Sequence, residues 1–124
     1  MSLPFLQSYL GLSNSLQTAQ GGEAPIIDPT RGVFGGGLIS VASDIIDYIT
    51  IATTGNATDF GDLTVARYAS GGVNSSTRGV FGGGDAGAAS NVMDYITIAT
   101  TGNATDFGDL TFARRLVAGI QNGL

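Results

Sequence analysis

The side chains best suited to chemistry in this sequence are aspartates that occur twice, 47 residues apart. Asp47, Asp59 and Asp62 return as Asp94, Asp106 and Asp109, whereas Asp44 is replaced by Asn91. Paired carboxylates hydrolyse glycosides or bind Ca²⁺. Carboxylates close to turns more often accept hydrogen bonds from backbone N–H groups. We therefore expect these side chains to stabilise turns, with Ca²⁺ binding as the alternative.

The composition argues against the common kinds of catalytic centre. The chain has 124 residues and contains no His and no Cys. It therefore lacks the commonest general base and the commonest ligand of transition metals. The glycine triplets at 35–37 and 82–84 are not followed by the Lys and the Ser or Thr of a phosphate-binding loop. We predict that the protein is not an enzyme, and we assign it no catalytic residue, no cofactor and no metal ligand.

The charged residues are few and mostly acidic. Five basic residues, all of them Arg, stand against ten acidic ones, which gives a net charge of -5. Nucleic-acid binding needs a basic face, so we expect no nucleic-acid partner. No apolar run approaches the roughly 18 residues needed to cross a bilayer, so we expect no membrane insertion. The repeated arginines should pair with the repeated aspartates, and binding of an acidic glycan is the alternative.

These residues belong to a unit that occurs twice. Residues 47–64 return letter for letter as residues 94–111, and residues 30–37 return as residues 77–84. A fixed period of this length is typical of repeat architectures. The sequence therefore predicts two repeat units, at about 30–76 and 77–124.

Each unit has the pattern of an all-β repeat. In the first unit, residues 32–34, 45–52, 57–63 and 64–73 are predicted to be short strands. Residues 45–52 are rich in Ile, Thr and Tyr, which strands favour, and the other segments carry apolar residues such as Phe34, Phe60 and Val73. Residues 53–56 supply Gly and Asn for a hairpin turn. Four short strands in about 40–50 residues are typical of one β-propeller blade. We predict two four-stranded blades.

The first 29 residues have a different pattern. Phe5, Tyr9, Leu12 and Leu16 recur at the spacing of a helical seam within residues 1–20. Residues 21–29 are rich in Gly and Pro and are predicted to be a linker. A helix this short needs a partner surface. That surface is either its own domain, a bundle of helices from several subunits, or a docking site on another protein.

The order of motifs in each unit resembles a kelch-type repeat. A strand ending in a glycine cluster is followed by an Asp-Tyr pair, an aromatic residue and an Ala-Arg element. Kelch repeats usually have Trp where this sequence has Phe. The repeated sequence, residues 31–37, 47–64 and 66–67 in the first unit, is also similar to kelch-like repeats in tail-fibre and other structural proteins of tailed phages, notably cyanophages. The positions that carry the resemblance are Arg31, Phe34, Gly35, Gly36, Asp47, Tyr48, Phe60 and Arg67, and in the second unit Arg78, Phe81, Gly82, Gly83, Asp94, Tyr95, Phe107 and Arg114.

The resemblance implies a virion structural protein. We expect a tail fibre or spike that contacts a host surface glycan, with the helical segment at 1–20 docking on other virion proteins. The alternative is a capsid or neck accessory protein without a receptor role. A carbohydrate-active enzyme is the remote alternative, because the sequence has no His and no acid pair outside the repeats.

Two blades are too few to bury their own faces. Closed propellers have about 4–8 blades, and repeat proteins need at least about three units. Residues 18–29 do not match residues 65–76, and the segment at 113–124 has no unit after it in the sequence given. We therefore expect head-to-tail association of copies, in which the last strand of one subunit completes the first blade of the next. A homotrimer with six blades is favoured, with the segments at 1–20 gathered on its axis.

Overall fold

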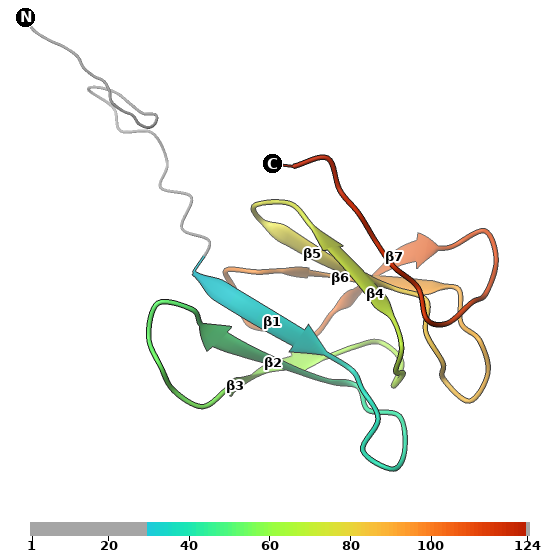
Figure 1. The fold of residues 1–124 in the computed structure, drawn as a ribbon, viewed down its shortest axis with the longest axis horizontal. Helices are drawn as coiled ribbons and strands as arrows, with labels where there is room; N and C mark the ends of the chain where they lie inside the picture. The colour runs from blue at the N-terminus through green and yellow to red at the C-terminus, as the bar shows by residue number, and fades with distance from the viewer. Residues whose placement is uncertain (1–29, 124) are drawn as a thin grey trace, which may run out of the picture.

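The computed structural model describes residues 30–123. This part of the chain is all β, as predicted, and contains no helix. Seven strands form two antiparallel sheets (Figure 1). The predicted helix at 1–20, with its seam at Phe5, Tyr9, Leu12 and Leu16, and the linker at 21–29 lie outside the described residues.

The first sheet consists of β1 (Arg31–Gly35), β2 (Ile45–Thr50) and β3 (Thr58–Asp62), in that order. Strand β1 pairs with β2 in a regular register, so that Phe34 lies opposite Asp47. The β2–β3 pairing shifts between Ile46 and Asp47. A shift of this kind is a bulge, which twists the strand and changes the direction of the side chains that follow.

The second sheet has the order β4-β5-β6-β7. Its strands are β4 (Gly71–Asn74), β5 (Arg78–Gly82), β6 (Val92–Thr97) and β7 (Thr105–Asp109). The last three repeat the first sheet, including the bulge, which here falls between Met93 and Asp94. Strand β4 is the additional member.

The position of β4 corrects the predicted strand at 64–73. We expected that strand to complete the first unit, but the strand begins only at Gly71 and belongs to the sheet of the second unit. The first sheet therefore has three strands among the described residues, instead of four. A tight turn explains this: Ser75 Oγ accepts a hydrogen bond from Arg78 N at 3.1 Å, and Ser75 N donates to Arg78 O at 2.8 Å. Strands joined by so short a turn become hairpin neighbours.

The glycine cluster at the end of β1 allows a close approach of two backbone segments. Gly36 has a φ of +72°, and a Cβ on it would lie 2.5 Å from the carbonyl oxygen of Arg67. Gly37 N donates to that same oxygen at 3.0 Å. Only glycine combines this backbone conformation with such a contact. The cluster thus fixes the segment that carries Arg67 against the end of β1.

The hydrophobic core lies between the two sheets. Its buried members are Ile46, Phe60 and Leu63 from the first unit and Ile96 from the second. Partly buried side chains from both units surround them, and these are Val33, Tyr48, Phe81, Ile98 and Ala104. One face of each sheet is therefore covered by the other sheet.

Candidate functional site

The contact between the two sheets contains the one ion pair of residues 30–123 in which both side chains are fully buried. Arg67 lies in the segment between β3 and β4, and Asp94 lies at the bulge of β6. Arg67 Nη1 donates to Asp94 Oδ2 at 3.0 Å, and both side chains are 0% exposed. The expected pairing of a repeated arginine with a repeated aspartate is found here, and it joins different units.

Further hydrogen bonds hold the two charges in place. The Thr64 backbone N–H and the Thr64 hydroxyl both donate to the Asp94 carboxylate. Arg67 Nη2 donates to the carbonyl oxygen of Phe81 at 3.3 Å, whereas Arg67 Nε has no partner among the described residues. Removing two charges from water is costly, and only such additional hydrogen bonds offset the cost. Both oxygens of the Asp94 carboxylate therefore accept hydrogen bonds at the junction, and loss of either charge would leave the other buried without its partner.

The edge strand β3 makes a second contact with the other sheet. Gly102 N donates to Phe60 O and Ala104 N donates to Asp62 O, both at 2.8 Å. Asn103 Oδ1 accepts a hydrogen bond from Asp62 N at 3.0 Å. The loop before β7 thus satisfies backbone groups of β3 that would otherwise form an open edge.

Arg31 makes a third contact across the junction. Its Nη1 donates to the carbonyl oxygen of Ile98 at 3.0 Å, and its guanidinium lies 4.1 Å from the centre of the Tyr48 ring. Arg78 has the same position over Tyr95, also at 4.1 Å. The cation–π geometry is thus a property of each unit, but the bond to Ile98 requires a following unit.

Equivalent side chains of the two units differ sharply in burial. Phe60 is 2% exposed, whereas Phe107 is 47% exposed. Arg67 is buried and Arg114 is exposed, and Asp94 is buried while Asp47 is half-buried. Residues 47–64 and 94–111 are identical, so the difference between Phe60 and Phe107 comes from the neighbouring sheet. The second sheet leaves open the face that carries Phe107, and the first sheet leaves open the face that carries Phe34 and Asp47.

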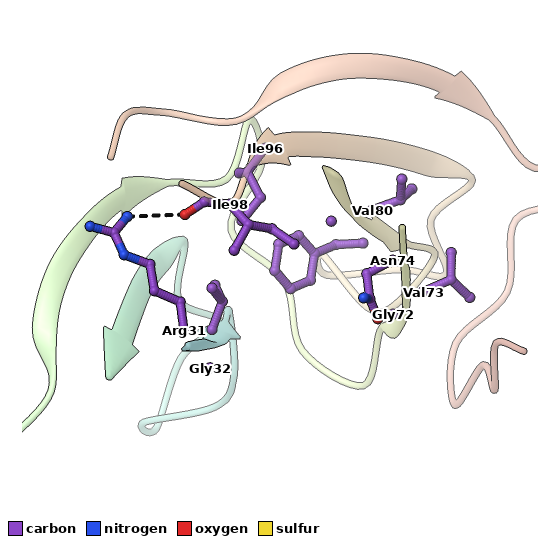
Figure 2. Close-up of a pocket in the computed structure, with 11 residues that line it drawn as sticks. Arg31, Gly32, Gly72, Val73, Asn74, Val80, Ile96 and Ile98 are labelled. Atoms are coloured by element: carbon purple, nitrogen blue, oxygen red, sulfur yellow. Dashed lines mark hydrogen bonds between the residues drawn. The ribbon is translucent and has the colours of Figure 1, made fainter. Parts of the chain in front are cut away.

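A cavity of about 330 Å³ lies between β1 and the pair β4–β5 (Figure 2). Its walls are mostly apolar side chains and backbone. Figure 2 shows Arg31 and Gly32 on one side and Gly72, Val73 and Asn74 on the other. The remaining lining residues are Val33, Gly79, Val80, Phe81, Ile96 and Ile98. The cavity therefore borders the edge of β1 that pairs with no strand among residues 30–123.

The structure divides the repeat positions singled out from the sequence into two groups. Those at the junction between the sheets are Arg31, Tyr48, Phe60, Arg67, Phe81 and Asp94. Those on the outward sides of the two sheets include Phe34, Asp47, Tyr95, Phe107 and Arg114. Glycines 35, 36, 82 and 83 line the strand ends where segments approach closely.

The sequence reading missed a second ion pair, between Asp85 and Arg115. Arg115 Nη1 lies 2.7 Å from Asp85 Oδ2, and Gly87 N donates to Asp85 Oδ1 at 2.9 Å. The equivalent residues of the first unit are Leu38 and Tyr68, so this pair is not repeated. Between the two units Leu38 changes to Asp85 and Tyr68 changes to Arg115, and this joint change to opposite charges is the sequence signal that would have identified the pair.

The hydrogen bond from Gly87 N, followed by that from Arg115, lowers the pKa of Asp85 below its ordinary value of 3.8. A carboxyl group whose pKa is lower in the folded state stabilises the fold above the unfolded-state pKa. That contribution is lost as the pH falls below 3.8 through the folded-state pKa. We expect Asp85→Asn to unfold at lower urea concentration than the parent at pH 7, and the gap should close in strong acid. A gap that persists unchanged at pH 2 would contradict this.

The described acidic residues show no metal-binding arrangement. Within residues 30–123, no three side chains of His, Cys, Asp or Glu come together as a set of metal ligands. Asp94 and Asp85 are engaged with arginines, and each also accepts a hydrogen bond from a backbone N–H group, that of Thr64 and that of Gly87 respectively. The described residues also include no helix of the length and apolarity that crossing a membrane requires.

Comparison with known proteins gives no family for the chain. No family model matches the sequence, and no curated protein matches it. The resemblance to kelch-like repeats of tailed-phage proteins therefore stays a prediction.

Proposed function

We propose that this chain is a structural protein whose two sheets are blades of an oligomeric, kelch-like β-propeller. The observation that carries the proposal is the junction between the sheets. It joins the face of the first sheet that carries Phe60 to the face of the second sheet that carries Phe81. The equivalent residues, Phe107 on the second sheet and Phe34 on the first, lie on the two open faces. Such a contact is heterologous, so further copies extend it until a ring closes.

The open faces supply the driving force for association. Phe34 and Ile51 are 62% and 63% exposed on the first sheet, and Phe107 is 47% exposed on the second. Exposed apolar side chains on a sheet face are typical of an interaction surface. Their counterparts Phe81, Ile98 and Phe60 are at least partly buried at the junction. Oligomerisation would bury the exposed set in the same way.

A trimer is the assembly we favour, because three chains supply six blades, within the usual propeller range of about 4–8. Native mass spectrometry of the purified 124-residue chain should find a species of three times the 12.5 kDa chain mass. A species of four chains would be consistent with a propeller of eight blades in place of six. A monomer at every concentration up to about 100 µM would overturn the proposal, since its association would then be weaker than about 5.5 kcal/mol.

We propose further that the propeller is a virion component, a tail fibre or spike, with the segment at 1–20 attached to other virion proteins. The repeat resemblance supports this role. Mass spectrometry of purified phage particles whose genome encodes the chain should detect it as a structural component. Its absence from complete particles would contradict the assignment.

One observation favours the second candidate, a capsid or neck accessory protein. The loop after β1 exposes Leu38, Ile39 and Val41, which are 57%, 69% and 67% exposed. Apolar loops of this kind suit contact with another protein better than contact with a polar glycan. A glycan array without binding, together with location at the capsid or neck in a reconstruction of the particle, would decide for this candidate.

A further inference from the structure

The segment after β7 leaves the second sheet by the same path that the segment after β3 takes from the first. Arg67 N donates to Ser43 O and Gly37 N donates to Arg67 O, both at 3.0 Å. Arg114 N donates to Ser90 O at 3.0 Å and Gly84 N donates to Arg114 O at 2.9 Å. The two bonds of the second unit therefore join the residues that lie 47 positions after those joined in the first unit. Arg114 is therefore held where it would reach a third sheet.

The open face of the first sheet offers the matching acceptor. Asp47 has the same place at the β2 bulge that Asp94 has at the β6 bulge. Thr111 and Arg114 correspond to Thr64 and Arg67, which donate to Asp94. Phe34 corresponds to Phe81, whose carbonyl oxygen accepts from Arg67 Nη2. One copy of the chain thus carries the donors of this site, and a second copy carries the acceptors.

The residues that follow Arg114 match the strand that the first sheet lacks within residues 30–123. Residues 118–121 are Ala-Gly-Ile-Gln, and the equivalent β4 is Gly-Gly-Val-Asn. Both have a small residue, a glycine, a β-branched residue and an amide in that order. Residues 24–27, the equivalent segment at the start of the chain, are Ala-Pro-Ile-Ile, and proline cannot donate to a strand ladder.

The space for such a strand is present beside β1. The cavity of Figure 2 is bounded by β1 on one side and by β4 and β5 on the other. In the described chain, Gly119 already lies against β4: a Cβ on it would be 2.6 Å from Val73 Cγ1. Gln121 Oε1 also accepts a hydrogen bond from Asn74 N at 2.6 Å. Residues 118–121 therefore border β4 on one side, and the cavity lies on its other side, towards β1.

We propose that two copies of the chain share one site, in which Arg114 and Thr111 of one copy bind Asp47 of the next copy. Residues 118–121 of the first copy add to the free edge of β1 in the second. The register follows from β4–β5, where Val73 lies opposite Val80 and Gly71 lies opposite Gly82. Ile120 should therefore lie opposite Val33, and Ala118 opposite Gly35. This inference rests on the proposed oligomer and specifies how it is joined.

Charge reversal tests the ionic part. Asp47→Arg and Arg114→Asp should each raise the concentration at which half of the chains are assembled by about 30-fold or more, because each places two like charges opposite each other in the interface. The variant with both changes should recover most of the affinity. Asp44→Arg alters the net charge by the same amount three residues away and should have little effect. Assembly unchanged in both single variants, measured by sedimentation at several concentrations, would overturn the shared site.

A mixture of the two single variants adds a test of ring size. Asp47→Arg chains have compatible contacts only with Arg114→Asp chains, on both sides. An alternating ring therefore closes with an even number of chains. Recovery of assembly on mixing supports the pairing. The strongest support would be a trimeric parent whose mixed variants assemble only as tetramers. No recovery on mixing, with recovery absent in the double variant as well, would overturn the pairing.

Disulfide trapping tests the strand register and does not depend on the charges. The chain has no cysteine, so Val33→Cys in a tagged copy and Ile120→Cys in an untagged copy report only their mutual contact. Directly opposed antiparallel residues lie within disulfide distance. Oxidation of the mixture should give a covalent dimer of one tagged and one untagged chain. Val73→Cys/Val80→Cys, the equivalent pair within one chain, is the positive control.

The outcomes separate this inference from the proposed function. An oligomer that forms but gives no such disulfide, while the control pair oxidises, overturns the strand exchange and leaves the structural oligomer standing. A chain that stays monomeric overturns both. If the disulfide forms, the variant with both cysteines gives closed covalent rings, and their mass under denaturing conditions counts the subunits.

Discussion

Phe60→Ala should lower the free energy of unfolding by about 3–5 kcal/mol, the usual cost of truncating a buried aromatic side chain. Phe60 is 2% exposed in the core between the sheets, and its ring packs edge-on against Tyr48 with the centroids 5.9 Å apart. Small domains are stable by only about 5–15 kcal/mol in total, so this change should bring the chain close to unfolding at room temperature. Urea denaturation followed by circular dichroism measures the loss.

The matched control is Phe107→Ala, which removes the same side chain from an identical sequence. Phe107 also packs edge-on against a tyrosine, Tyr95, at 6.0 Å, but it is 47% exposed. In dilute, monomeric protein the loss should be about 1 kcal/mol, because only about half of the side chain leaves water on folding. At concentrations where copies associate, the loss should grow. Equal losses for the two variants in the monomer would show that the junction does not bury Phe60.

Arg67→Met is expected to be the most damaging change of a charged residue. It leaves the carboxylate of Asp94 buried without its partner, and breaking a buried ion pair from one side costs about 3–5 kcal/mol. A second substitution, Asp94→Leu, should recover a large part of the stability, because an apolar pair of similar volume has no uncompensated charge. The free energies of unfolding of Arg67→Met, Asp94→Leu and the double variant, each measured in urea, give the coupling between the two positions.

Arg114→Met provides the corresponding control. Arg114 is exposed, so its replacement should change the stability of the dilute monomer by less than about 0.5 kcal/mol, as is usual at the surface. The same variant should assemble poorly, if Arg114 binds Asp47 of a second copy. Loss of monomer stability as large as that of Arg67→Met would mean that Arg114 has a buried partner in its own chain.

The sequence predicted the strands well where residue type decides them. Residues 45–52 are rich in Ile, Thr and Tyr, and residues 57–63 follow a hairpin turn with Phe60 and Leu63 as apolar anchors; β2 and β3 lie within these two segments. The prediction was wrong for residues 64–73, where Val65 and Tyr68 suggested a strand. Most of that segment crosses between the sheets: Arg67 N donates to Ser43 O of the first unit, and Tyr68 N donates to Asp85 O of the second. These bonds join residues distant in sequence, so local propensity does not reveal them.

The repeated arginines and aspartates show the same division. Scarcity of charge predicted that Arg67 would find an aspartate, but three repeated aspartate positions were available in the sequence. The choice of Asp94 depends on the bulge between Met93 and Asp94 and on the approach of the segment at 64–70 to the other sheet. The Asp85–Arg115 pair escaped notice because neither residue is repeated: Leu38 and Tyr68 stand at the equivalent positions of the first unit.

By itself the sequence determined the all-β class, the two units and the kinds of side chain that meet, because strand propensity and repetition are properties of local sequence. Only the tertiary structure decided that β4 belongs to the second sheet, and that Phe60, Arg67 and Asp94 are buried while Phe107, Arg114 and Asp47 are more exposed. Residues 47–64 and 94–111 are identical, so their local preferences are identical as well. Burial differs because it depends on which sheet lies next to each face, and a sheet has two faces.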